Sequence, residues 1–141
     1  MHRFVFGMLA LLAFAPGLNA AEKATVYKDP GCGCCNEYIA YLQQHGFDVT
    51  AVNTRNLDQI KRQHGVPSGF ESCHTVLVGG YVVEGHVPVG VVNRLLAERP
   101  AVKGISLPGM PLGSPGMNGP KSGPFVIYSF SEQGQRVYAT E

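Results

Sequence analysis

The alternation of apolar and polar residues along the chain predicts short strands and helices in close succession. Runs rich in β-branched and aromatic residues predict strands, and apolar positions at helical spacing that end at Gly or Pro predict helices. The predicted strands cover residues 24–28, 47–52, 75–78, 81–84, 125–130 and 135–140. The predicted helices cover residues 36–45, 57–64 and 89–99. Residues 104–124 are dense in Gly and Pro and are predicted to be irregular.

The order of these elements predicts the fold class, because a cysteine motif lies where the first strand gives way to the first helix. The turn 29–31 leads into Cys32-Gly-Cys34-Cys35, just before the predicted helix. Cys32 and Cys35 form a Cys-x-x-Cys pair at this junction, and the chain continues β-α-β-β-α. This pattern is typical of an α/β, thioredoxin-like domain. A Gly/Pro/Met-rich loop and a terminal β-hairpin follow it.

The first twenty residues have the features of a secretory signal peptide. Arg3 gives a positive start, residues 4–15 form an apolar run, and Ala20 is a small residue at the expected cleavage point. The apolar run is shorter than the roughly 20 residues that a membrane-spanning helix needs. We therefore expect residues 1–20 to be removed on export. Residues 21–141 would form one periplasmic domain without a membrane anchor.

Charge and composition exclude several classes of function. Without Arg3, the eleven basic residues become ten, which equals the number of acidic residues. No basic run is present, which argues against nucleic acid or an anionic membrane as a partner. The sequence also contains no phosphate-binding loop, no Ser/His/Asp set and no paired carboxylates in a suitable setting, so hydrolase and nucleotide-binding functions have no support.

The four cysteines carry the candidate chemistry, and three interpretations of them are open. An even number of cysteines in an exported chain ordinarily indicates disulfides, but Cys34 and Cys35 are adjacent and poorly placed to pair with each other. A thiol at a helix N-terminus favours the thiolate, which serves both disulfide exchange and soft-metal binding. Exchange needs only Cys32 and Cys35. Because Cys34 adds a third thiol and the loop carrying Cys73 is expected to approach the motif, metal binding is favoured.

Among metals, copper(I) fits the available donors better than zinc. Zinc accepts four cysteines, but the Cys-x-Cys-Cys spacing differs from the paired motifs of zinc ribbons. Thiolate, thioether and imidazole together select Cu(I), and bridging thiolates can hold several ions. The further candidate donors lie near predicted strand ends or in the Gly/Pro loop: His74, His86, Met110 and Met117. His45 and His64 end predicted helices, where the helix dipole explains them without a metal.

Four motifs in order resemble the CopG-type copper-resistance proteins of Gram-negative bacteria. These motifs are Lys28–Cys35, Ser72–Thr75, Tyr81–Pro88 and Gly109–Met117. The resemblance implies a periplasmic thioredoxin-like domain that binds copper in copper resistance, with a thiolate-bridged multi-copper cluster as one form of the site. It implies Cys32, Cys34, Cys35 and Cys73 as ligands, and more weakly the two histidines and the two methionines.

The sequence leaves the use of bound copper open. The domain would either store and pass Cu(I) or cycle copper between Cu(I) and Cu(II) as an oxidoreductase. Its partners would be copper ions and other periplasmic copper-handling proteins. Two rival functions stay open at this point: a thiol-disulfide oxidoreductase that uses Cys32 and Cys35, and a disulfide-stabilised adaptor without free thiols.

Overall fold

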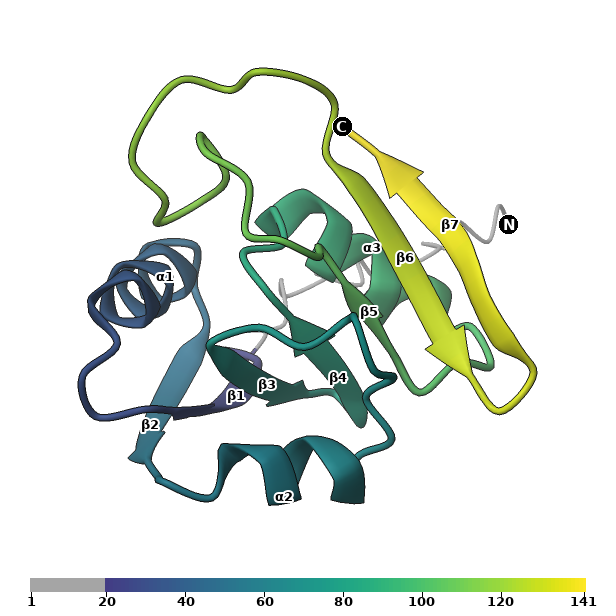
Figure 1. The fold of residues 1–141 in the computed structure, drawn as a ribbon, viewed down its shortest axis with the longest axis horizontal. Coiled ribbons are helices and arrows are strands. Elements are labelled where there is room, and N and C mark those ends of the chain that lie inside the picture. The colour runs from purple at the N-terminus through teal and green to yellow at the C-terminus, as the bar shows by residue number, and fades with distance from the viewer. Residues whose placement is uncertain (1–19) are drawn as a thin grey trace, which may run out of the picture.

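The structure is a computed structural model that describes residues 20–141, so the predicted signal peptide lies almost wholly outside the described residues. The strands are β1 (Lys23–Lys28), β2 (Asp48–Asn53), β3 (His74–Val78), β4 (Tyr81–Glu84), β5 (Gly104–Ser106), β6 (Val126–Ser131) and β7 (Gly134–Thr140). The helices are α1 (Gly33–Gln44), α2 (Leu57–Gln63) and α3 (Val89–Glu98). Together they build the α/β fold that the sequence predicts (Figure 1).

The strands form one seven-stranded sheet in the order β2-β1-β3-β4-β5-β6-β7. β1 is parallel to β2 and antiparallel to β3, and β3 and β4 form an antiparallel hairpin. The β1-α1-β2 crossover followed by this hairpin is the thioredoxin-like arrangement. The register pairs Lys28 with His74 and Thr75 with Glu84, and these pairs mark the end of the sheet where the cysteines gather.

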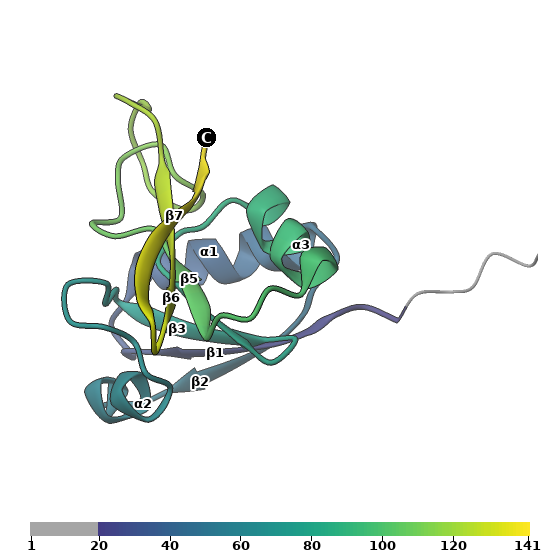
Figure 2. The ribbon, with the colours of Figure 1, turned by 90° about the vertical axis from the view of Figure 1, so that its right-hand side faces the viewer.

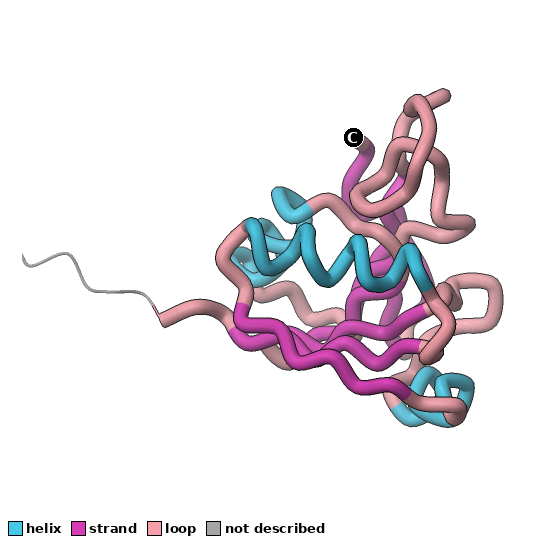
Figure 3. Tube along the Cα trace, turned by 90° about the vertical axis from the view of Figure 1, so that its left-hand side faces the viewer, coloured by secondary structure: helices cyan, strands magenta, loops and turns pink. Residues whose placement is uncertain are grey.

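Helices cover both faces of the sheet. Figures 2 and 3 show α1 and α3 on one face and α2 on the other. α1 buries Cys35, Tyr38 and Leu42 toward the core, a spacing of three and four residues that places them on one side of the helix. Full burial of a large apolar side chain contributes roughly 1.5–3 kcal/mol. This packing therefore fixes where the N-terminus of α1, and the cysteines on it, must lie.

Strand β5 contradicts the prediction that residues 104–124 are irregular throughout. Residues 104–106 pair with β4 in parallel and with β6 in antiparallel orientation. A side chain at Gly104 would overlap the Val82 carbonyl and the Phe130 ring, so the glycine is what allows the neighbouring strands to approach so closely. The prediction failed because these contacts come from distant parts of the chain.

The segment that follows β5 is irregular, as predicted, and it arches away from the sheet before it returns as β6 (Figure 1). The terminal hairpin predicted over residues 125–140 is present as β6 and β7, joined by a short turn. Within the described part of the chain, no helix has both the length and the apolar character needed to span a bilayer.

Candidate metal centre

The first helix begins earlier than predicted, and this places two cysteines inside it. α1 starts at Gly33, not Asn36, so Cys34 and Cys35 belong to its first turn. Cys32 is the N-cap residue, and its sulfur accepts a hydrogen bond from the Cys35 amide at 3.3 Å. These three sulfurs therefore lie at the N-terminal end of α1, where the helix dipole is positive.

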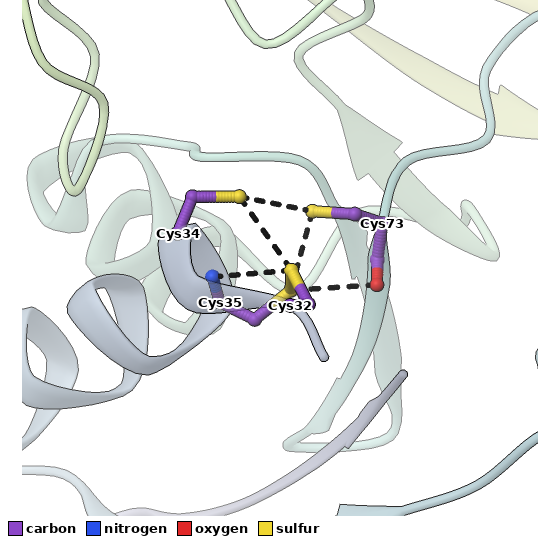
Figure 4. A group of neighbouring side chains, drawn as sticks. All are labelled: Cys32, Cys34, Cys35 and Cys73. Carbon is purple, nitrogen blue, oxygen red and sulfur yellow. Dashed lines mark hydrogen bonds between the residues drawn. A yellow bond between two sulfur atoms is a disulfide. The ribbon is translucent and has the colours of Figure 1, made fainter. Parts of the chain in front are cut away.

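The fourth cysteine completes a compact group of sulfur atoms. Cys73 comes directly before β3, and the antiparallel β1–β3 pairing brings it opposite the N-terminus of α1. Its sulfur lies 3.6 Å from that of Cys34 and 3.2 Å from that of Cys35, and the Cys32 and Cys34 sulfurs are 3.5 Å apart (Figure 4). All four sulfurs lie within 4.8 Å of one another. We call these residues the sulfur cluster; the structure gathers them as the sequence predicted.

Two of the four cysteines form a disulfide and two are free thiols. Cys32 is bonded to Cys35, while Cys34 and Cys73 remain free. An adaptor held together by two structural bridges would need Cys34 and Cys73 to be paired as well. The structure thus favours a reactive or metal-binding group over a purely structural one. Reduction of the Cys32–Cys35 bond by a dithiol would give four thiols in the same small volume.

Two buried imidazoles adjoin the sulfur cluster at Cys73. His74, His86 and Cys73 place their ligand atoms within 4.8 Å of one another. His74 donates from Nε2 to the Gly85 carbonyl at 3.1 Å, so its Nδ1, 3.7 Å from the Cys73 sulfur, is the acceptor nitrogen. His86 donates from Nδ1 to the Pro115 carbonyl at 2.5 Å. Each ring is thereby held in a fixed tautomer, in the way that backbone carbonyls hold the rings of metal-ligating histidines.

His86 also carries an unpaired polar atom. Its Nε2 is buried and has no hydrogen-bond partner, which is an unfavourable state for a neutral imidazole acceptor inside a protein. Because Nδ1 is already used by Pro115, Nε2 is the nitrogen free to bind. A metal ion shared with Cys73 would satisfy it, so the residues present fit a soft metal.

Burial sets the protonation of these groups in the metal-free protein. Desolvation lowers the pKa of His74 to about 3, with a further contribution from the nearby His86, and desolvation also lowers the pKa of His86. Both imidazoles are therefore neutral at pH 7 and can act as ligands. Burial, together with the neighbouring Cys34, raises the pKa of Cys73 to about 12. Its thiol is protonated until a metal ion displaces the proton.

The depressed pKa of His74 predicts acid sensitivity of the metal-free protein. The unfolded chain takes up this proton near pH 6.5, whereas the folded protein takes it up only near pH 3. In between, the unfolded state binds more protons, so the free energy of unfolding falls as the pH falls. We expect urea denaturation of the reduced, metal-free protein to show lower stability at about pH 5 than at about pH 7. The free energy of unfolding should change less steeply with pH in His74→Gln than in the wild type. An equal slope in both proteins would show that His74 is not the group responsible.

The two loop methionines occupy different places. Met110 lies with its sulfur 3.2 Å from that of Cys73, so it joins the sulfur cluster as a thioether neighbour. Its backbone has a φ of 44°, which a non-glycine residue adopts only at a cost. Met117 instead lines an open pocket of about 450 Å³, which Cys34 also lines. The loop therefore presents one thioether to Cys73 and another on the pocket beside Cys34.

Gly116 fixes how closely this loop approaches the centre. It has a φ of 81°, and a Cβ at this position would lie 2.8 Å from the Tyr38 amide nitrogen and 3.1 Å from His86 Nδ1. Only glycine allows the loop to pack this closely against Tyr38 and His86, so that the neighbouring Pro115 carbonyl can reach His86. The aromatic ring of Tyr38 in turn packs against the rings of His74 and His86, with centroids 5.0 and 5.1 Å away.

A pair of glycine substitutions separates this steric effect from backbone strain. Gly116→Ala and Gly109→Ala both place a side chain at positive φ, but a Cβ at Gly109 would meet nothing within 4 Å. The shared strain should cost about 1 kcal/mol in each variant. We expect Gly116→Ala to lose at least about 1 kcal/mol more, because overpacking adds its own cost. Thermal unfolding of the metal-free proteins measures this difference, and equal losses would argue against tight seating of the loop.

Sequence reasoning missed a buried ionic group next to the centre. Lys61 of α2 and Glu84 at the end of β4 form an ion pair at 2.8 Å, with side-chain exposures of 5% and 0%. Nothing in the local sequence marks them, because one lies in a short helix and the other in a strand. His45 and His64 lie at the ends of α1 and α2, as predicted, where each is the C-cap residue of its helix.

The fold and the donor set define the class of protein: a thioredoxin-like α/β domain with a candidate soft-metal centre at the N-terminus of its first helix. The chain is similar to two solved structures of the copper resistance protein CopG, designated form 2 and form 1. Each is 36% identical; they cover 86% and 84% of this chain and 98% and 96% of their own, with TM-scores of 0.80 and 0.78. The chain belongs to the CopG family of copper resistance proteins.

A family model also matches the segment that carries the further donors. The model described as "Protein of unknown function, DUF411" matches residues 70–117. This range contains Cys73, both candidate histidines and both loop methionines. No curated protein matches the chain. Membership of a copper resistance family, together with a cysteine group able to hold a metal, gives this chain a copper-related function.

Proposed function

We propose that the protein is an exported copper-binding protein of copper resistance, which holds Cu(I) in the periplasm at Cys32, Cys34, Cys35 and Cys73. Residues 1–20 would be removed on export, leaving residues 21–141 as the working domain. The signal-like N-terminus and membership of the CopG family support this proposal. The crowding of the thiols supports a centre with more than one copper ion, bridged by thiolates.

The observation that carries the proposal is the soft-donor group itself. Four cysteine sulfurs lie within 4.8 Å of one another, and the thioether of Met110 adjoins them. His86, whose buried Nε2 is unpaired, adds an imidazole with a ligand nitrogen within 4.8 Å of the Cys73 sulfur. Thiolate, thioether and neutral imidazole are the ligands that Cu(I) prefers, whereas Mg²⁺ and Ca²⁺ prefer oxygen.

The open pocket that Cys34 and Met117 line suggests how copper would enter. Cys34 is half-buried, whereas Cys35 is fully buried, so Cys34 is the more accessible of the two cysteines in the first turn. A thioether and a thiol on one pocket could take Cu(I) from a copper-handling partner before the buried donors receive it. In this proposal Met117 is an entry ligand, and Met110 belongs to the centre.

The first test is a copper count. The purified protein is reduced without oxygen and titrated with Cu(I), and bound copper per chain is measured for the wild type and for Cys34→Ser. We expect more than one tightly held copper per chain in the wild type and a clear loss in the variant, because a hydroxyl is a poor ligand for a soft ion. His45→Gln, an exposed histidine at the end of α1, is the control and should bind as the wild type does.

A second candidate function is supported by the Cys32–Cys35 disulfide at the start of α1. A thiol-disulfide oxidoreductase would use this pair to exchange electrons with a dithiol substrate, with Cys32 or Cys35 as the attacking thiolate. That function predicts that Cys34→Ser has little effect and that Cys35→Ser abolishes turnover. One or no copper per chain, unchanged in Cys34→Ser, would favour it over the copper-binding proposal.

A further inference from the structure

The buried residue of α2 is a lysine. Its relative exposure is 4%, and it is the buried residue of a seven-residue helix. A short surface helix ordinarily buries apolar side chains against the sheet, and lysine is almost never fully buried without a partner. Well-packed apolar residues of similar volume often stabilise a protein as much as a buried ion pair does, or more. The presence of the ion pair therefore suggests a role other than stability.

Lys61 donates its hydrogen bonds to the two chain segments that carry the candidate ligands. Its Nζ donates to the His74 carbonyl at 3.0 Å, to the Thr75 hydroxyl at 2.9 Å and to the Glu84 carboxylate at 2.8 Å. His74 opens β3 immediately after Cys73, and Glu84 ends β4 two residues before His86. One ammonium group thus connects both segments.

Glu84 completes the connection from the other strand. Its carboxylate accepts hydrogen bonds from the Ser72 amide at 2.9 Å and from the Thr75 hydroxyl, and the Ser72 hydroxyl lies 2.9 Å away. The Ser72 hydroxyl also accepts from the Gly85 amide at 2.9 Å. The partners of the carboxylate therefore flank Cys73 on both sides and adjoin His86.

We infer that Lys61 and Glu84 are positioning residues for copper binding, which hold Cys73, His74 and His86 in the geometry a metal ion needs. This inference rests on the proposed function. We call Lys61, Ser72, Thr75 and Glu84 the Lys61–Glu84 network. Lys61 belongs to α2, which covers the face of the sheet opposite to α1 (Figures 2 and 3). The cysteines at the start of α1 and Cys73 are therefore fixed from separate sides. Groups that orient metal ligands in this way commonly change metal affinity when removed.

The test uses a double variant that removes both charges together. Lys61→Met/Glu84→Gln avoids an unpaired buried charge, so the fold should persist, but the ammonium hydrogen bonds to His74, Thr75 and Glu84 are lost. We expect the same number of coppers per chain as in the wild type and an affinity for Cu(I) lower by about 10- to 100-fold, the range typical of lost orienting contacts. Competition with a Cu(I) chelator measures the affinity.

Two further readouts separate positioning from stability. The ultraviolet thiolate-to-copper absorption should change in the double variant. In the metal-free protein, amide hydrogen exchange at His74 and His86 should become faster. The control is Ile127→Val, which trims a fully buried residue of β6 and should lower stability without changing copper affinity or the absorption. Equal affinity in a folded double variant would overturn the inference.

The experiment also distinguishes the inference from the proposed function. If the wild type binds no copper, the proposed function fails; if the wild type binds copper and the folded double variant binds it equally well, only the inference fails. Should the double variant not fold, Ser72→Ala takes its place, because Ser72 is half-buried and links the network to Gly85. It should lower the Cu(I) affinity several-fold, and an unchanged affinity would overturn the inference.

Discussion

Cys73→Ser is expected to lose most of the copper that the wild type binds, and more than Cys34→Ser loses. The Cys73 sulfur is the one that lies close to every kind of donor in the centre: two cysteine sulfurs at 3.2 and 3.6 Å, the Met110 sulfur at 3.2 Å and His74 Nδ1 at 3.7 Å. A serine oxygen at this place is a hard ligand and cannot bridge soft ions as a thiolate does. The histidine side of the centre would be separated from the cysteines of α1.

Bound copper per chain, measured after anaerobic Cu(I) titration, tests this expectation. Circular dichroism of the metal-free variant establishes that it folds, which is expected because Cys73 is half-buried and free. His45→Gln serves as the control, with full copper content. A Cys73→Ser protein that holds as much copper as the wild type would show that the cysteines of α1 suffice, and the centre described above would have to be revised.

Lys61→Met alone is expected to destabilise the protein by about 3–5 kcal/mol, because it leaves the Glu84 carboxylate buried without its cation. The carboxylate would keep its hydrogen bonds to Ser72 and Thr75, but these do not replace the lost charge. Such a loss is a large part of the total stability of a domain of this size. The double variant Lys61→Met/Glu84→Gln should recover most of it, since no unpaired charge remains.

Urea denaturation of wild type, both single variants and the double variant gives the coupling energy between the two residues. We expect the summed losses in the free energy of unfolding of the two single variants to exceed the loss of the double variant by several kcal/mol, as for a buried ion pair. The exposed i,i+4 pair Arg94–Glu98 is the control, and Arg94→Met should change the stability far less than Lys61→Met does, because exposed ion pairs contribute little. If the losses in the free energy of unfolding from the Lys61 and Glu84 substitutions simply add, the two charges do not stabilise each other.

Much of the fold was predictable because its signals are local. Within residues 20–141, apolar periodicity and turn residues predicted the three helices and six of the seven strands near their observed positions. The missed strand, β5, has only one large apolar residue, Ile105. Its pairing depends on Gly104 fitting between Val82 and Phe130, residues that lie far away along the chain. The start of α1 was placed late, because a cysteine-rich first turn has no helical pattern of its own.

The donors themselves are visible in the amino-acid sequence: a Cys-x-Cys-Cys motif, a fourth cysteine next to a histidine, and methionines in a Gly/Pro loop. Donor type follows from residue type, so the preference for a soft metal could be read without coordinates. Which of these donors come into contact depends on how distant parts of the chain pack together. The β1–β3 pairing brings Cys73 to the helix N-terminus. The seat of Gly116 lets Pro115 orient His86 and leaves its Nε2 free. The burial of Lys61 and Glu84, like these contacts, depends on residues distant in sequence.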